Sequence, residues 1–220
     1  PAHSNKDQKR IQMQNPDSRD LHKLRLLDHV EKTPRLTHRS AAKVMGVSIK
    51  LAHDLLSGMV ERGLLHVKKH HARRWDYFLT TKGLTEKARL TMEFIDFSMH
   101  FYREARKFSA QLCRDLAESN RLKVDFLGTG DLAEITYLGV QEWGLELQHV
   151  YDDQATTFLG RQVESTSKLS ENTSDAVIVC LYDRKHPMLA GYLPESIPPS
   201  PNMVWIFKAA TENRSNSSGS

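Results

Sequence analysis

The sequence has few cysteines and no long apolar run. Cys113 and Cys180 are its two cysteines, and they stand far apart without partners at the spacing of a metal site. No apolar stretch approaches the roughly 20 residues of a membrane span, and no apolar secretory segment lies near the start. We therefore expect a cytoplasmic protein without a functional disulfide, a metal centre or a membrane span.

Recognisable catalytic patterns are also missing. The sequence shows no nucleophile with a matching base, no Tyr-x-x-x-Lys motif and no cluster of metal ligands. These absences argue against an enzyme, and we expect none. An enzyme that acts on a nucleotide-sugar is the least favoured alternative.

The net charge of +4 hides an asymmetry along the 220 residues. Residues 1–120 hold 23 Lys and Arg against 14 Asp and Glu, whereas residues 121–220 hold 8 against 13. A basic half fits a polyanionic partner such as double-stranded DNA, and an acidic half does not. The charge boundary predicts two domains with different roles, for which the chain is long enough.

Residues 18–83 show the helix start and stop signals of a winged helix-turn-helix. Capping residues precede each apolar helical pattern, and glycine or proline follows it. The expected elements are a helix that begins at Asp17 or Ser18 and ends at Thr33-Pro34, a helix from Thr37 to Gly46, a helix over 48–61, and strands over 64–67 and 76–80 that flank a polar tip, "KKHHARRW". The tail before them, residues 1–17, is expected to be disordered.

A long helical pattern follows, which we assign to residues 84–120. Neither proline nor glycine interrupts it, and one apolar stripe runs along it. The stripe consists of Leu90, Phe94, Phe97, Phe101, Ala105, Phe108, Leu112 and Leu116. We expect a homodimer through helix 84–119, in which this stripe packs against its copy; the alternative is that it folds back onto its own chain.

A recognition helix lies in the major groove of DNA, where its first outward residues reach base edges. On helix 48–61 the outward residues include Ile49 and Asp54, and Asp54 is unfavourable beside phosphates unless it accepts from a cytosine amine. A basic wing, 68–74, supplies salt-dependent affinity for the DNA backbone. The expected DNA-binding residues are Thr37, Ser48, Lys50, Leu51, His53, Ser57, Lys68, Lys69, His70, His71, Arg73 and Arg74.

Residues 19–118 resemble the MarR-type winged-helix transcription regulators, above all a subgroup associated with exopolysaccharide gene clusters. The resemblance lies in "LTHRSAAKVMGVSIKLAHDLLSGMVERGLL" and in "YFLTTKGLTEKARLT" with the long helix behind it. It implies a homodimeric repressor or activator that binds a near-palindromic operator and controls polysaccharide genes. The chain departs from the subgroup at Arg74-Trp75 in the wing and at Leu51 and Asp54, which leaves the operator sequence open.

Residues 121–208 change to short β-type runs separated by turns: "KVDFL", "LELQHVY", "AVIVCL" and "MVWIF". A helix over 131–143 joins the first two, and such alternation predicts a small α/β Rossmann-like domain with a mainly parallel sheet. The fold class is thus an α+β winged helix-turn-helix with a long helix, followed by this domain. The last residues, 209–220, are expected to be disordered.

The stretch "DFLGTGDLAE" is a candidate nucleotide site. Gly128, Gly130 and Ala133 fit the dinucleotide pattern, and Asp152 or Asp153 stands where a ribose hydroxyl is usually held. The candidate cofactor-binding residues are Gly128, Gly130, Asp131, Asp152 and Asp153. In the alternative, Asp131 caps the helix, occupying the place of a pyrophosphate, and the glycines only turn the chain.

Two further resemblances concern this half. A winged helix followed by a Rossmann unit is similar to the NADH-sensing redox repressors, without their fuller glycine signature. Residues 128–153 with "FLGRQV" and "DAVIVCL" look more like the small nucleotide-binding domain in front of sugar acyltransferases. They imply a nucleotide, NAD(H) or a nucleotide-sugar as effector; the alternative is a domain that binds no ligand and serves dimerisation or protein docking.

Overall fold

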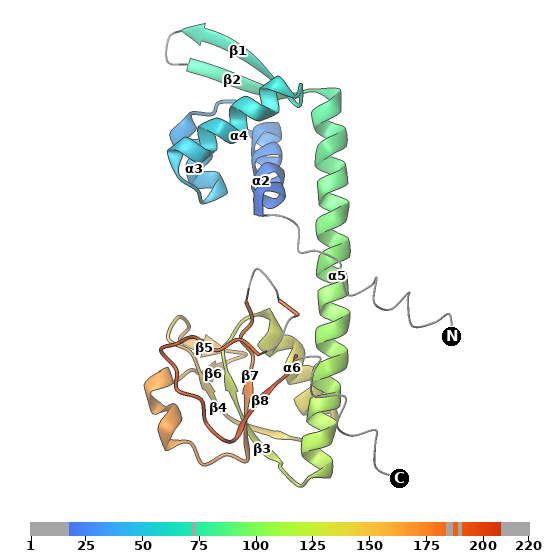
Figure 1. The fold of residues 1–220 in the computed structure, drawn as a ribbon, viewed down its shortest axis with the longest axis vertical. Coiled ribbons are helices and arrows are strands. Elements are labelled where there is room, and N and C mark those ends of the chain that lie inside the picture. Colours follow the sequence, from blue (N-terminus) through green and yellow to red (C-terminus); the bar gives the residue numbers. More distant parts are fainter. Residues whose placement is uncertain (1–17, 72–73, 184–186, 189–190, 208–220) are drawn as a thin grey trace, which may run out of the picture. The chain divides into compact units, whose positions relative to one another are not determined.

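The computed structural model describes residues 18–71, 74–183, 187–188 and 191–207 (Figure 1). Residue contacts divide the chain into two compact units, Pro1–Ser98 and Met99–Ser220. The boundary falls inside helix α5, Thr81–Glu118. The tails expected to be disordered, 1–17 and 209–220, lie outside the described residues.

In its described part, the first unit contains three helices and a two-stranded antiparallel sheet, followed by the start of α5. Its core is apolar, and Leu26, Met45, Leu56 and Met59 are among its most enclosed side chains. The elements are α2 (Ser18–Lys32), α3 (His38–Met45), α4 (Ile49–Glu61), β1 (Leu65–His71) and β2 (Arg74–Leu79). This order confirms the predicted winged helix-turn-helix.

The wing strands are longer than the sequence analysis predicted. Strand β1 continues to His71 and β2 begins at Arg74, so most of the stretch expected as a polar tip is β-strand. The prediction of a loop there was wrong. A two-stranded ribbon leaves side chains open to water, so polar residues fit its strands. In β1, His66 and Lys68 are exposed, while Val67 between them packs against the core.

Helix α5 begins at Thr81, before the expected Leu84, because Thr80 caps it. The Oγ1 atom of Thr80 accepts a hydrogen bond from the Gly83 amide (3.0 Å) and donates one to the carbonyl of Gly63 (2.7 Å). A Cβ atom at position 83 would lie 2.0 Å from the carbonyl oxygen of Leu64, so only glycine fits. These contacts explain the "LTTKG" motif as the joint between wing and helix.

The second unit is built on a four-stranded parallel sheet with the order β4-β3-β7-β8 (Figure 1). One face packs against α6 and the last part of α5, and the other against η1 and the segment around Ile197. The elements are β3 (Lys123–Leu127), α6 (Asp131–Glu142), β4 (Glu146–Tyr151), β5 (Thr157–Phe158), β6 (Arg161–Gln162), η1 (Thr166–Glu171), β7 (Ala176–Val179) and β8 (Met203–Trp205). The predicted mainly parallel sheet is confirmed; the hairpin β5-β6 was not predicted.

The apolar stripe of α5 is used differently from our expectation. Leu90 belongs to the core of the first unit, whereas Phe101, Ala105, Leu112 and Leu116 pack in or against the core of the second. The prediction that the whole stripe packs against a second subunit was therefore wrong for these residues. Periodicity shows that a helix face is apolar, but it does not show which surface covers that face.

Candidate functional site

The helix-turn-helix is held by caps at both of its helices. Thr37 and Ser40 form a capping box on α3, in which Thr37 Oγ1 accepts from the Ser40 amide (3.1 Å) and Ser40 Oγ accepts from the Thr37 amide (2.8 Å). Gly46 ends α3 with φ +70°. Ser48 then caps α4 by accepting from the Leu51 amide (3.2 Å). Thr37 and Ser48 thus fix the first turns of the two helices.

The expected base-reading residues at the start of α4 are exposed. Ala52, Leu56 and Met59 of the same helix are buried in the core. Ser57 is half-buried, so it is the least accessible of the candidates. The exposed residues are Ser48, Ile49, Lys50, Leu51, His53 and Asp54.

His38 was missed by the sequence analysis. Its ring meets that of His53 edge-on (centroids 4.8 Å apart) and that of Trp75 in the wing (6.0 Å). Burial, helped by the neighbouring His53, lowers the pKa of His38. His53 also lies 3.4 Å from the Asp54 carboxylate, measured from Nδ1 to Oδ1. The three rings connect α3, α4 and the wing, a contact that no local sequence pattern indicates.

The structure describes the side chains of only part of the cationic residues expected in the wing. Lys68 is exposed and pairs across the ribbon with Asp76. Arg73 lies outside the described residues, and Lys69, His70, His71 and Arg74 are described only as strand backbone. The amide of Tyr77 donates to the carbonyl of Pro34 (2.9 Å), which fixes β2 against the segment before α3.

The glycine turn joins β3 to α6. Gly128 has φ +103°, and its amide donates to the carbonyl of Tyr151 (2.8 Å). A Cβ atom there would lie 2.7 Å from Leu181 Cδ2, so Gly128 is required by the turn itself. Gly130 is the N-cap of α6 with φ −74° and open space around a would-be Cβ, so the fold does not require glycine there. Ala133 is fully buried behind them.

The two aspartates proposed to hold a ribose both accept hydrogen bonds from other residues of the chain. Asp152 accepts from the amide (3.0 Å) and hydroxyl (2.7 Å) of Thr129, and from the amide of Gln154 (2.8 Å). Asp153 accepts from Ser165 Oγ (2.9 Å) and from the amide and hydroxyl of Thr166. Hydrogen bonds from Thr166 lower the pKa of Asp153. Asp131 is exposed in the first turn of α6.

The described residues at the carboxyl ends of the strands leave little room for a ligand. An apolar hollow lies there, lined among others by Leu132 at the start of α6 and by Leu181, Trp205 and Phe207. It encloses about 10 Å³, which is enough for one water molecule. In this conformation the hollow does not admit a nucleotide.

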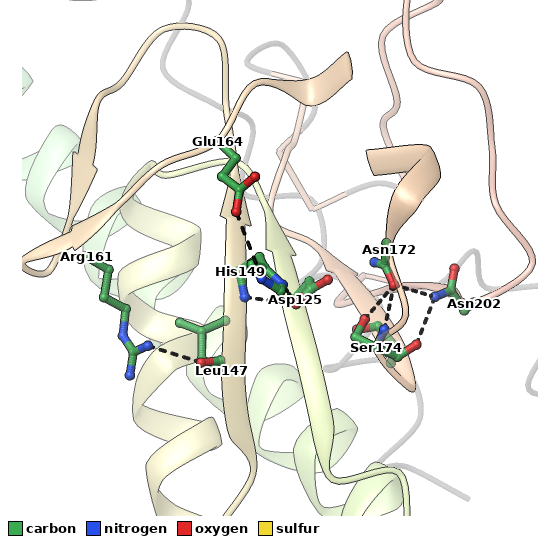
Figure 2. Close-up of polar contacts among 9 residues, drawn as sticks. Asp125, Leu147, His149, Arg161, Glu164, Asn172, Ser174 and Asn202 are labelled. Atoms are coloured by element: carbon green, nitrogen blue, oxygen red, sulfur yellow. Dashed lines mark hydrogen bonds and ion pairs between the residues drawn. The ribbon is translucent and has the colours of Figure 1, made fainter. Parts of the chain in front are cut away.

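A buried carboxylate inside β3 was also missed by the sequence analysis (Figure 2). Asp125 is fully buried, and its Oδ1 accepts from the His149 amide (2.9 Å) where the register between β3 and β4 shifts. The imidazole Nδ1 lies 3.4 Å from the same oxygen, and Nε2 lies 3.9 Å from Glu164. Burial raises the pKa of Asp125. Its evident role is to satisfy a backbone amide that the bulge removes from the ladder.

A second polar group in Figure 2 connects the starts of β7 and β8. Asn172 Oδ1 accepts from the amide (2.7 Å) and hydroxyl (3.0 Å) of Ser174, and Asn202 Nδ2 donates to the Ser174 carbonyl (3.2 Å). Arg161 Nη1 donates to the Leu147 carbonyl (3.1 Å) beside β4. These contacts hold loops in place at the amino ends of the strands, whereas the glycine turn lies at the carboxyl end of β3.

The part of the chain that the structure describes shows no group of three or more His, Cys, Asp or Glu side chains placed to hold a metal ion. Within the same residues, no helix combines the length and apolarity that crossing a membrane requires.

No protein-family model and no curated protein matches the chain. Among solved structures, it is similar to MepR, a transcription regulator of the Staphylococcus aureus multidrug efflux pump MepA, with 22% identity over 43% of this chain and 69% of that one and a TM-score of 0.33. It is also similar to human N-acetylserotonin methyltransferase in complex with SAM, with 14% identity over 74% of this chain and 65% of that one and a TM-score of 0.28. Both likenesses are too distant to carry an argument, and the fold assignments depend on the elements described above.

Proposed function

We propose that the protein is a DNA-binding transcription regulator that places α4 in the major groove and lays the wing along the DNA backbone. The observation that carries this proposal is the exposed, capped first turn of α4, with Lys50 and His53 on its outer side. Both side chains can donate to the acceptors that bases present in the major groove. Arg39 and Lys43 on α3 and Lys68 on the wing are exposed as well and supply charge for phosphates.

The proposal predicts duplex binding that depends on salt. A duplex enriched from a random library by the full-length protein would be titrated by fluorescence anisotropy over a range of salt concentrations. Lys50→Ala, Lys68→Ala and Arg39→Ala should each weaken binding, and a lost phosphate contact lowers the salt slope by about 0.9. Lys123→Ala, an exposed lysine of the second unit, is the matched control and should change neither. Salt-independent binding, or no enrichment at all, would contradict the proposal.

We further propose that α5 pairs with its copy in a homodimer through a face other than the one expected. Met92 (57% exposed), Ile95 (45%), Met99 (48%) and Tyr102 (42%) recur at spacings of three and four residues along α5. Such spacing forms one apolar stripe on a helix, suited to a helical partner. A symmetric dimer would read a near-palindromic operator.

Sedimentation of the full chain tests this dimer. Ile95→Glu and Met99→Glu should each shift the protein toward monomer, because they place a charge in the stripe. Gln111→Glu, an exposed change on another side of the helix, should leave the dimer intact. A wild-type monomer at micromolar concentration would refute the proposal.

For the second unit, the structure favours docking or dimerisation over nucleotide sensing. The carboxylates of Asp152 and Asp153 already accept hydrogen bonds within the chain, so a ribose at Asp152 would have to displace Thr129. If a nucleotide does bind, Gly128, Gly130 and Asp131 are the residues that we propose to lie beside it. Thermal unfolding of the full chain with NADH, NAD, ATP or nucleotide-sugars decides between the two roles, because a ligand at a hundred times its Kd adds about 2.7 kcal/mol. The link to polysaccharide genes stays a prediction from the family resemblance.

A further inference from the structure

Two aliphatic side chains are exposed to solvent on the first turn of α4, the proposed recognition helix. Ile49 is 51% exposed and Leu51 is 36% exposed. The other large aliphatic residues of α4 behave differently: Leu56 and Met59 are buried, and Leu55 and Val60 pack against the core. Ile49 and Leu51 thus stand outside the core cluster of the first unit, and their aliphatic nature calls for another explanation.

The setting of these two residues is polar and cationic. Lys50 lies between them in sequence and is exposed, and Arg39 and Lys43 are exposed on the preceding helix. The nearby Asp54 carboxylate lies 3.4 Å from His53 Nδ1, so its charge has an adjacent imidazole. Exposed aliphatic side chains on a helix start that also exposes Lys50 complement a polyanion that carries apolar groups better than they complement an apolar protein surface.

The major groove offers one apolar group, the C5 methyl of thymine. The other base edges there present hydrogen-bond donors and acceptors, which aliphatic side chains cannot satisfy. Building on the proposed function, we infer that Ile49 and Leu51 select thymine by packing against its methyl groups, and that the operator half-site carries thymines opposite the start of α4. Lys50 supplies affinity to the same turn without this preference for a methyl group.

Replacement of thymine by uracil tests the inference, because it removes the methyl group and leaves the base-pairing edge unchanged. In the duplex enriched by the full-length protein, each thymine would be replaced in turn. We expect wild-type binding to weaken about fourfold at one or more positions in each half-site, which corresponds to about 0.8 kcal/mol for one buried methylene-sized group. Equal affinity for all thymine and uracil duplexes would overturn the inference.

Variants assign the effect to the two side chains. Ile49→Ala or Leu51→Ala should bind the thymine duplex more weakly and lose the discrimination at its own position. Lys50→Ala is the matched control, which should weaken binding to both duplexes and keep their ratio. Circular dichroism shows whether each variant folds. If both alanine variants kept the wild-type ratio, other residues would read the methyl groups and the inference would be wrong. Absence of salt-dependent DNA binding would instead contradict the proposed function itself.

Discussion

The hydroxyl of Thr129 donates a 2.7 Å hydrogen bond to Oδ2 of Asp152, and the amide of Thr129 donates to the same oxygen at 3.0 Å. This pair joins the glycine turn after β3 to the end of β4. The carboxylate that the sequence analysis placed against a ribose thus has a partner within the protein. The turn is closed by the protein's own side chains.

The Thr129–Asp152 pair should therefore contribute to stability. Thr129→Val removes the hydroxyl but keeps its shape, and we expect it to lower the free energy of unfolding by about 1 kcal/mol. Thr129→Ser keeps the donor and should cost less. Urea denaturation followed by tryptophan fluorescence measures both variants. If Thr129→Val matched the wild type, the pair would be incidental and Asp152 would be free for a ligand.

Local signals in the sequence sufficed to predict much of this fold. Thr37, Gly46 and Ser48 stand at helix ends because their side chains or backbone satisfy terminal groups, a requirement that acts within a few residues. The alternation of strand and helix likewise implied a parallel sheet. Local chemistry of this kind is readable without tertiary structure.

The features that escaped prediction depend on contacts between distant segments. Leu90 and Leu116 lie on the same predicted stripe, yet they enter different cores. His38 gains its role from His53 and Trp75, which approach only in the folded unit. Asp125 sits inside an apolar strand, where its bulge-closing role depends on the register with β4. Periodicity and composition carry no information on such partners.

The two glycines of the turn should respond oppositely to the same substitution. Gly128→Ser forces a side chain into a left-handed backbone and against Leu181, so we expect it to destabilise the protein by more than about 1 kcal/mol. Gly130→Ser meets open space and gives α6 a side-chain cap, so it should be neutral or stabilising by up to about 1 kcal/mol. Thermal denaturation compares them. A large loss at Gly130 would mean that its role is not explained by the chain alone.

Asp125 should make stability depend on pH. Burial raises its pKa, so the folded state retains the proton to higher pH than the unfolded state. The free energy of unfolding therefore receives a contribution that falls as pH rises from about 4, the ordinary carboxyl range. Asp125→Asn keeps an oxygen acceptor for the His149 amide and should remove this contribution, which makes it at least as stable as wild type at pH 7.

Asp125→Ala is the contrasting variant. It leaves the His149 amide without its acceptor, and a buried unpaired amide costs about 1–3 kcal/mol. Urea unfolding between pH 4 and pH 8 distinguishes the two changes. Equal destabilisation by Asn and Ala across that range would show that the carboxylate charge, rather than the acceptor, supports the bulge.

Both cysteines should be unreactive in the native protein. Cys113 is fully buried and Cys180 is nearly so. Burial raises the pKa of Cys113 to about 12 and that of Cys180 still further, so the reactive thiolate is scarce at pH 8. We expect a disulfide reagent such as DTNB to label neither cysteine until urea unfolds the second unit, and then to label both. Rapid labelling of the folded protein would show local opening of this core.

A substitution in the turn of the β5-β6 hairpin should raise the free energy of unfolding. Leu159 has φ +46° and is 53% exposed, and with Gly160 at φ +79° it forms a two-residue turn between Phe158 and Arg161. Asn-Gly is the preferred pair where both residues have positive φ, so Leu159→Asn should raise the free energy of unfolding by about 0.5–1 kcal/mol. Leu159→Val should lower it, because a β-branched side chain resists this conformation. Urea unfolding of dilute and concentrated protein checks both variants. If Leu159→Asn were less stable than the wild type only in concentrated protein, Leu159 would contribute through a contact with a second protein molecule.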